Sequence, residues 1–174
     1  MEIQAEVSPI DSLERKLIRG GARWVADLNE FFRDYRIDDA TFSLYAKGRT
    51  RTQGFLLSRF VAWTVLPNYE VGLFAEDVSS DLLTVDRIRK RIEVVNRLAE
   101  KENFHWSWLI FFSDREIPSS VFSFVTRYDK KEIGLGVASS SSGQIVASNN
   151  QLGKSIRGQL GLRKTVKVQA PRNG

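Results

Sequence analysis

The sequence predicts an α/β protein with a mixed sheet, in which a helix, three strands, a helix and a strand form the core, with an added hairpin and a C-terminal helix. Apolar residues recur every three or four positions over residues 9–36 and again after Thr84, as on the buried faces of helices. Elsewhere they alternate or run continuously over short stretches, as in strands. A hydrophobic content of 42% with 11 Phe is typical of a folded chain.

The first helical pattern covers residues 9–36 and predicts one long amphipathic helix or two. Its apolar stripe consists of Leu13, Leu17, Ile18, Trp24, Val25, Leu28, Phe31, Phe32 and Tyr35. Asp11, with Glu14 three residues later, predicts a capping box at its start. Gly20 and Gly21 mark the place where the helix is expected to bend or divide.

Three strands are predicted next. Residues 41–47 alternate between apolar and polar side chains, the period of a half-buried strand. The polar, glycine-flanked residues 48–54 read as a hairpin loop. A second strand is expected over residues 55–66, ended by Pro67, and a third over residues 69–75.

The second helix is predicted to begin at Thr84, a residue suited to the N-cap position. Its outward side is basic, with Arg87, Lys90, Arg91, Arg97 and Lys101. Acids are interspersed along that side, so an ordinary solvated face is favoured over a binding surface. Residues 104–112, FHWSWLIFF, are apolar on both alternating faces and predict a central strand covered on both sides.

The remaining segment predicts further strands over residues 121–127 and 133–137. Residues 144–147 resume the strand pattern, and Gly143 supplies a position for positive φ. The serine run before Gly143 is therefore expected at the tip of a hairpin. Asn149 is expected to cap a short final helix.

Charge is unevenly distributed along the chain. We expect residues 1–160 to form a single α/β domain and residues 161–174 a basic tail. Residues 151–174 contain no acid and six positive residues, Lys154, Arg157, Arg163, Lys164, Lys167 and Arg172. The net charge of the whole chain is +5. The rest of the chain is nearly neutral. This pattern indicates either an arm that binds a polyanion or a tail kept basic for solubility.

Several classes of chemistry are excluded or made improbable by composition. Without cysteine there is no disulfide, thiolate nucleophile or Cys-ligated metal site. The one histidine, His105, lies in an apolar strand, which favours a hydrogen-bonded core or edge residue over a general base. No apolar run is long enough for a membrane span, and the acidic amino terminus is unlike a signal peptide. We therefore expect a cytoplasmic protein without a membrane partner.

Motifs for phosphate and base recognition are weak. Gly134-Leu-Gly136 lacks the third glycine of a dinucleotide fingerprint, so close strand packing is the favoured explanation. Three tryptophans are expected in the core rather than as stacking platforms: Trp63, Trp106 and Trp108. The residues expected to contact a nucleic-acid backbone are Arg49, Arg51, Lys154, Arg157, Arg163, Lys164 and Lys167. For the Arg49–Arg51 loop, an ordinary charged hairpin tip is the slightly favoured alternative.

Carboxylates at strand ends are candidates for a metal site, because metal-dependent nucleases hold Mg²⁺ with acids from adjacent strands. Asp38 and Asp39 precede the first predicted strand, Glu70 starts the third, and Glu76 with Asp77 ends it. They form a site only if the first and third strands lie close together. Structural roles are favoured, because acids at strand ends are common.

The strand NYEVGLFAED, residues 68–77, leads to a helix and then to the apolar strand WSWLIFF, residues 106–112. With the order of elements over residues 9–113, these motifs resemble the core of the restriction-endonuclease-like superfamily, the PD-(D/E)xK nucleases. Holliday junction resolvases and Mrr-type endonucleases belong to it. The resemblance implies an α/β nuclease fold with a Mg²⁺ site.

The superfamily pattern places an acid at the head of the second core strand and Glu-x-Lys on the third. The matching residues here are Asp38 or Asp39 and then Glu70-Val-Gly72, with glycine at the lysine position. In a nuclease, the resemblance assigns catalysis to Asp38, Asp39 and Glu70, and the metal to Asp39 and Glu70. The missing lysine implies a degenerate member that binds without cutting and needs no cofactor.

Three functions follow as hypotheses. The first is a non-catalytic protein that binds DNA or RNA through basic residues. The second is a Mg²⁺-dependent endonuclease or Holliday-junction-resolvase-like enzyme with displaced acids. The third is a structural or interaction subunit, such as a homodimer, whose aromatic surface meets a partner chain.

Overall fold

The computed structural model describes residues 7–19, 26–50 and 69–159. The elements, in chain order, are α1 (Pro9–Ile18), β1 (Ala26–Ile37), β2 (Ala40–Thr50), β3 (Glu70–Asp77), α2 (Val85–Glu102), β4 (Phe104–Ser113), α3 (Ser119–Arg127), β5 (Ile133–Ser139), β6 (Ile145–Ala147) and α4 (Gln151–Gln159). The protein is therefore a mixed α/β protein. The strand predicted over residues 55–66 and the residues Trp63 and Arg51 lie outside the described ranges.

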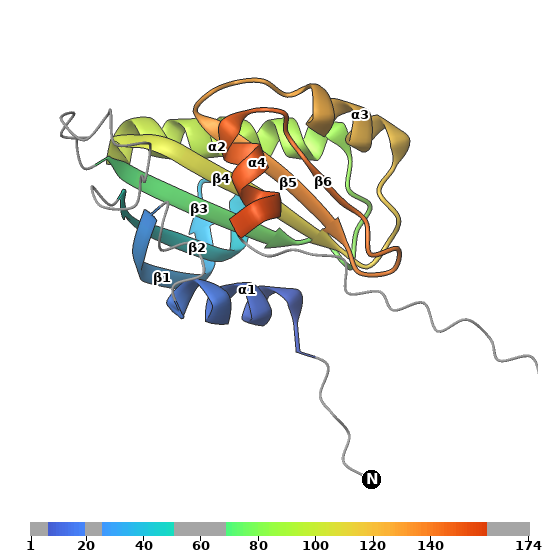
Figure 1. Cartoon of the computed structure of the whole chain (residues 1–174), viewed down its shortest axis with the longest axis horizontal. Coiled ribbons are helices and arrows are strands. Elements are labelled where there is room, and N and C mark those ends of the chain that lie inside the picture. The colour runs from blue at the N-terminus through green and yellow to red at the C-terminus, as the bar shows by residue number, and fades with distance from the viewer. Residues whose placement is uncertain (1–6, 20–25, 51–68, 160–174) are drawn as a thin grey trace, which may run out of the picture.

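The strands form one sheet in the order β1-β2-β3-β4-β5-β6. The first three strands form an antiparallel meander, β3, β4 and β5 run parallel, and β6 returns antiparallel to β5. Helices cover both faces (Figure 1). The residues of α2 and α3 share one hydrophobic core with the sheet, and those of α1 and α4 share the other.

The prediction of a helix over residues 9–36 is correct only for its first part. α1 ends at Ile18, and Ser8, rather than the predicted Asp11 capping box, caps it by accepting bonds from the amides of Ile10 and Asp11. Asp11 and Glu14 instead form ion pairs with Arg33 of β1. These pairs, together with the buried Leu13 and Leu17, hold α1 against the sheet.

Residues 26–37 form β1, so the helix predicted there is wrong. The register with β2 shifts between Leu28 and Glu30, and Asp34 has a positive φ of 48°. Such irregularities break the two-residue alternation of a regular strand. Phe32 and Tyr35 therefore lie three residues apart yet both contact the ring of Tyr45. Spacings of three and four in this segment arise from an irregular strand, although they imitate a helix.

Residues 119–127 form α3, so the strand predicted over residues 121–127 is also wrong. β4 and β5 are parallel, so the chain between them must return from the end of β4 to the opposite end of the sheet, where β5 begins. Such crossover connections are usually helices. The buried residues Val121 and Val125 are four apart, on the side of α3 that faces the sheet. The segment is too short for its periodicity alone to separate the two structures.

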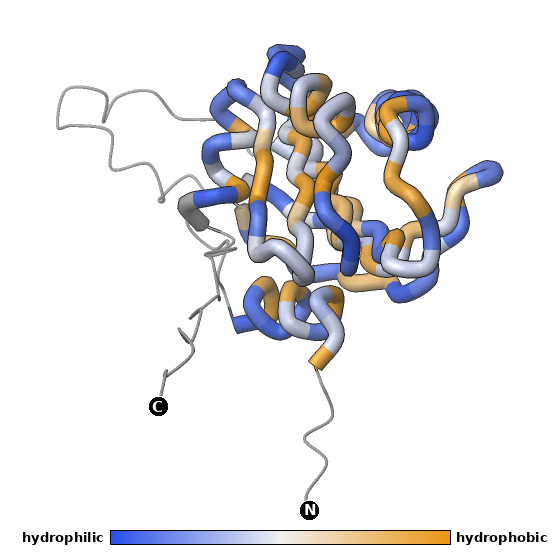
Figure 2. The backbone as a smooth tube through the Cα atoms, turned by 90° about the vertical axis from the view of Figure 1, so that its right-hand side faces the viewer, coloured by the Kyte–Doolittle hydropathy of each residue, from blue (hydrophilic) through white to orange (hydrophobic). Residues whose placement is uncertain are grey.

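Several predictions are confirmed. Thr84 caps α2 by accepting a bond from the amide of Arg87. β4 is central and belongs to both hydrophobic cores. The serine run joins β5 to β6 with Gly143 at φ 64°. Figure 2 shows the hydrophobic stretches gathered along the strands, with hydrophilic residues toward the outside.

Candidate nucleic-acid interface

α4 carries the first two cations of the acid-free C-terminal stretch and is held tightly against the sheet. Leu152 and Ile156 are buried on β5 and its neighbours. A Cβ atom at Gly134 would lie only 2.7 Å from the backbone carbon of Leu152, so glycine permits this close approach. The indole nitrogen of Trp108 donates to the hydroxyl of Ser155 at 2.8 Å. Lys154 and Arg157 consequently face solvent on the opposite side of the helix.

The start of α4 is fixed by Asn150 rather than by the predicted Asn149. The side-chain oxygen of Asn150 accepts a bond from the amide of Gly153 at 2.7 Å. Its side-chain nitrogen donates to the carbonyls of Lys130 and Ile133 at 2.6 and 2.7 Å. The buried hydroxyl of Ser148 donates to the same side-chain oxygen. One side chain thus joins the beginning of α4 to the beginning of β5.

A groove of about 380 Å³ lies beside this helix and is called the α4 groove here. It is lined by Thr126, Ala147, Ser148, Asn149, Gly153, Lys154 and Arg157. The lining contains two cations and no acid. Within the described ranges, neither Lys154 nor Arg157 forms an ion pair with a carboxylate. Because Lys154 and Arg157 are three residues apart on a helix, their side chains are neighbours, and a single extended anion can reach both.

The basic side of α2, in contrast, is largely neutralised by carboxylates of the same chain. Arg87 and Arg91 both bind Glu76 of β3, each at 2.7 Å. Arg97 binds Asp38 at 2.8 Å. The solvated face expected for α2 is thus mainly an ion-pair surface that ties the helix to β3 and to the β1–β2 turn.

Glu76 is the central carboxylate of this network. Its side chain is only 4% exposed, and it accepts bonds from both arginines through its two oxygens. Burial lowers the pKa of Arg87, but hydrogen bonds to Asp81 and Glu76 outweigh it and raise the pKa above the ordinary value. Glu76 therefore has a structural role, because its oxygens already accept several arginine N–H groups.

Arg49, the other basic residue predicted to contact phosphate within the described ranges, forms an ion pair with Glu70 across the β2–β3 pairing. The side chain of Arg49 is 68% exposed, so the pair is open to solvent. Arg51, Arg163, Lys164 and Lys167 lie outside the described residues. Arg49 lies on β2, whereas Lys154 and Arg157 lie on α4, which contacts β4, β5 and β6. The sheet order separates these two places, because β3 lies between β2 and β4.

The acids considered for a metal site do not converge. Asp39 directly precedes β2, whereas Glu70 pairs with Arg49 near the other end of that strand. Ten residues of extended chain span on the order of 30 Å. In the part of the chain that the structure describes, no group of three or more His, Asp or Glu side chains is placed to hold a metal ion.

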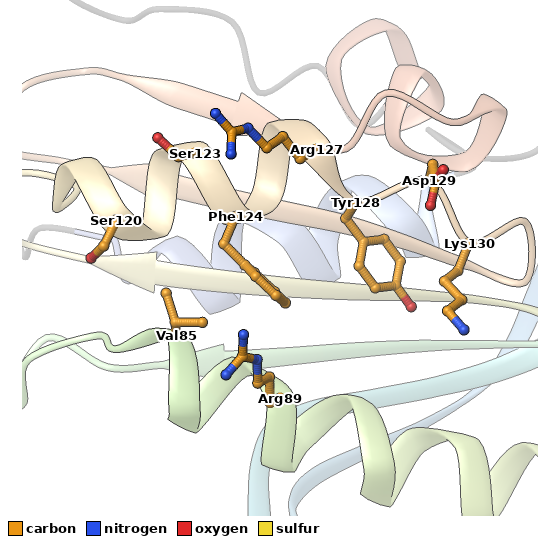
Figure 3. Close-up of a pocket in the computed structure, with 9 residues that line it drawn as sticks. All are labelled: Val85, Arg89, Ser120, Ser123, Phe124, Arg127, Tyr128, Asp129 and Lys130. Carbon is orange, nitrogen blue, oxygen red and sulfur yellow. The ribbon is translucent and has the colours of Figure 1, made fainter.

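A second recess, called the α2–α3 cleft here, was not predicted from the sequence. It is an open cleft of about 540 Å³ lined by Val85, Arg89, Ser120, Ser123, Phe124, Arg127, Tyr128, Asp129 and Lys130. Phe124, Tyr128 and Lys130 extend toward α2, and Val85 and Arg89 extend toward α3 (Figure 3). The helical spacing of Val121, Phe124 and Val125 was the signal available in the sequence.

The other aromatic residues and the serine run have structural roles. Trp108 is buried, while Trp106 is half-buried against the α1 and α4 core. His105 is exposed and lies against the ring of Tyr69, with the ring centres 4.1 Å apart. In the serine run, the hydroxyl of Ser139 donates to the carbonyl of Arg115 and accepts from Ser142. These bonds build a turn, and the hydroxyl is thereby engaged within the protein.

Comparison of the chain with models of protein families, with curated proteins and with solved structures gave no match. None of the described helices combines the length and apolar character needed to cross a membrane.

Proposed function

We propose that this protein binds nucleic acid without cleaving it, contacting the phosphate backbone through Lys154 and Arg157 in the α4 groove. The observation that carries the proposal is the contrast between cationic surfaces. Arginines of α2 bind carboxylates of the same chain, whereas Lys154 and Arg157 line a groove without an acid. Cations left available in this way bind phosphates and release counterions.

A polyanion is favoured over a small anion because the positive charge continues along the sequence. After α4, the chain adds Arg163, Lys164, Lys167 and Arg172 and no acid. Phosphate contacts of this kind position a nucleic acid without reading its sequence. The proposed ligand is therefore DNA or RNA bound through its backbone, with the basic tail adding contacts.

The proposal includes a restriction-endonuclease-like architecture. It is supported by the order of α1, three antiparallel strands, α2 and a β4 strand parallel to β3. At Gly72, where the superfamily has lysine, a Cβ atom would lie 2.8 Å from the ring of Phe104. The glycine at this position and the separation of Asp39 from Glu70 support a binding role.

Fluorescence anisotropy with labelled duplex and single-stranded DNA or RNA, at low and moderate salt, tests the proposal. The double variant Lys154→Ala/Arg157→Ala is expected to weaken binding by about 10-fold or more, because hydrogen bonds to charged groups contribute about 1.5–3 kcal/mol each. The matched control is Lys90→Ala/Lys101→Ala, which removes the same charge from exposed positions on α2. Equal losses in both variants, or no binding at low salt, would contradict the proposal.

Cleavage is tested separately by incubating the protein with plasmid and branched DNA in Mg²⁺ or Mn²⁺. We expect both substrates to remain intact. Cleavage that disappears in Asp39→Ala or Glu70→Ala would replace the binding function by the nuclease hypothesis and would assign the metal to those acids.

A further inference from the structure

We propose that the α2–α3 cleft receives one unstacked base of a single-stranded nucleic acid whose phosphates lie along the α4 groove. This inference rests on the proposed function and adds the form of nucleic acid that the protein prefers. It is carried by the chemistry of the cleft, by its charge and by its connection to the groove.

The aromatic lining of the cleft supplies a stacking surface. Phe124 and Tyr128 are half-buried, with ring centres 6.3 Å apart, and both pack on the core shared by α2 and α3. Their packing restricts the rings before any ligand arrives. Base-on-aromatic stacking tolerates any base, because every base has a π face, and the cavity volume of about 540 Å³ lies within the usual range for small ligands.

The guanidinium of Arg89 marks where a planar group can lie. It is placed over the ring of Phe124, 5.4 Å from the ring centre. Its ion pair with Asp86 is long at 3.7 Å, and its side chain is 62% exposed. Moving Arg89 off the ring therefore costs little. A base can then stack on Phe124 while the displaced guanidinium binds the adjoining phosphate.

The charge of the cleft fits a nucleotide. Three cations, Arg89, Arg127 and Lys130, line it against one acid, Asp129. Arg89 and Lys130 extend into the space between the helices, whereas Arg127 extends away from α2 at the edge of the cleft (Figure 3). Ser120 adds a hydroxyl group that can donate to the ligand, whereas the side chain of Ser123 extends away from α2 (Figure 3). A neutral aromatic ligand would leave these cations unused, whereas a nucleotide unit uses both the aromatic lining and the charges.

The cleft and the α4 groove are neighbours on the same element. Thr126 lines the groove and the next residue of α3, Arg127, lines the cleft. Lys130 lines the cleft, and its carbonyl accepts a bond from Asn150, which fixes the start of α4. A strand can therefore cross the C-terminal turn of α3 from one recess to the other.

The experiment compares a labelled single-stranded oligonucleotide with a duplex of the same length in the full chain. Phe124→Leu keeps an apolar side chain but removes the stacking ring, and we expect it to weaken single-strand binding by about 5- to 100-fold. Duplex binding should be unchanged, because paired bases cannot enter the cleft. The matched control is Phe122→Leu, an exposed phenylalanine on α3 outside the cleft, which should change neither.

A second measurement locates the base directly. An oligonucleotide containing 5-iodouracil should photocrosslink to the tryptic peptide of residues 116–127, which contains Phe124, or to the peptide of residues 128–130, which contains Tyr128. Circular dichroism and thermal unfolding of each variant establish that its fold is retained.

The outcomes separate the two proposals. If Phe124→Leu leaves single-strand binding unchanged while Lys154→Ala/Arg157→Ala weakens it, the cleft proposal is overturned and the backbone-binding function stands. If the unaltered protein binds neither nucleic acid, both are overturned. If thymidine monophosphate binds through Phe124 but the oligonucleotide does not bind, the cleft is a mononucleotide site and the strand proposal is overturned.

Discussion

At the scale of single residues, Glu76 decides how α2 is joined to the sheet. Its buried carboxylate balances the charges of Arg87 and Arg91. Glu76→Gln would leave two guanidinium groups facing a neutral amide in a poorly hydrated place. We expect the free energy of unfolding to fall by about 2–4 kcal/mol, toward the lower part of the range for broken buried pairs because Arg87 is partly exposed.

Chemical denaturation of Glu76→Gln measures this change, and Glu70→Gln is its control. Glu70 also forms a strand-to-arginine ion pair, but Arg49 in that pair is 68% exposed. Exposed pairs contribute at most about 1 kcal/mol. Equal losses of unfolding free energy in the two variants would contradict the prediction, because they would show that the buried pair of Glu76 contributes no more to stability than the exposed pair of Glu70.

Tyr128 predicts a dependence of stability on alkaline pH. Burial, with the nearby carboxylates of Glu132 and Asp129, raises its pKa to about 12. An unfolded tyrosine ionises near pH 10, so its stabilising contribution is complete below about pH 10 and is lost as the pH rises toward 12. The free energy of unfolding should therefore decline over this window.

The measurement is a series of denaturation curves from neutral to alkaline pH for the unaltered protein and for Tyr128→Phe. The decline should be smaller in the variant, because phenylalanine does not ionise. It should not vanish, since burial also raises the pKa of Tyr45, which both proteins retain. Identical declines would remove Tyr128 as a cause.

At the scale of elements, α4 depends on the absence of side chains on β5. In Gly134→Ala, the new Cβ atom would meet the backbone of Leu152 and of Gly153, at 2.7 and 2.9 Å. Backbone cannot rotate away, so the helix must shift. We expect a loss of about 1–3 kcal/mol in the free energy of unfolding and weaker nucleic-acid binding, because Lys154 and Arg157 move with α4.

Gly136→Ala is the matched control for this prediction. Its Cβ atom would meet side-chain carbons of Ile156 at 3.1 Å, and a side chain can adjust. Denaturation and anisotropy should both show a smaller effect than in Gly134→Ala. A larger effect at Gly136 would contradict the view that α4 is fixed mainly by contact at Leu152.

The elements also show what sequence pattern can and cannot predict. α2 and β4 were predictable because a long amphipathic stripe and a continuous apolar run each have one good structural solution. β1 was mistaken for helix because its register shift and the positive φ of Asp34 produce helical spacings. α3 was mistaken for a strand because only the parallel pairing of β4 with β5, a tertiary feature, requires a crossover there.

The candidate site was predictable only in part for the same reason. Lys154 and Arg157 are conspicuous in the sequence because no acid follows them. Whether a cation is available depends on distant carboxylates, however. Arg97 binds Asp38 from the β1–β2 turn, a partner 59 residues away in the chain. The α2–α3 cleft lies between two helices, and their position relative to one another is set by how each packs on the folded sheet.

At the scale of the whole molecule, α2 and α4, which pack on opposite faces of the sheet, differ in how far their cations are paired with carboxylates of the same chain. The α2 side uses arginines to bind Glu76 and Asp38, whereas α4, on the opposite face, presents Lys154 and Arg157 to solvent. The net charge of +5 therefore understates the attraction of one surface for a polyanion. Salt dependence of binding measures this attraction, because it counts the phosphates neutralised rather than the total charge.

The affinity for nucleic acid should fall linearly with salt concentration on logarithmic axes. Each cation that contacts a phosphate should contribute about one to the slope, so Lys154→Ala and Arg157→Ala should each reduce it by about one. Lys90→Ala, an exposed lysine on α2, should leave it unchanged. Deleting residues 161–174 removes Arg163, Lys164, Lys167 and Arg172 and should reduce the slope further. A slope unaffected by the deletion would remove residues 161–174 from the interface. A slope unaffected by both Lys154→Ala and Arg157→Ala would exclude the α4 groove as the phosphate-binding surface.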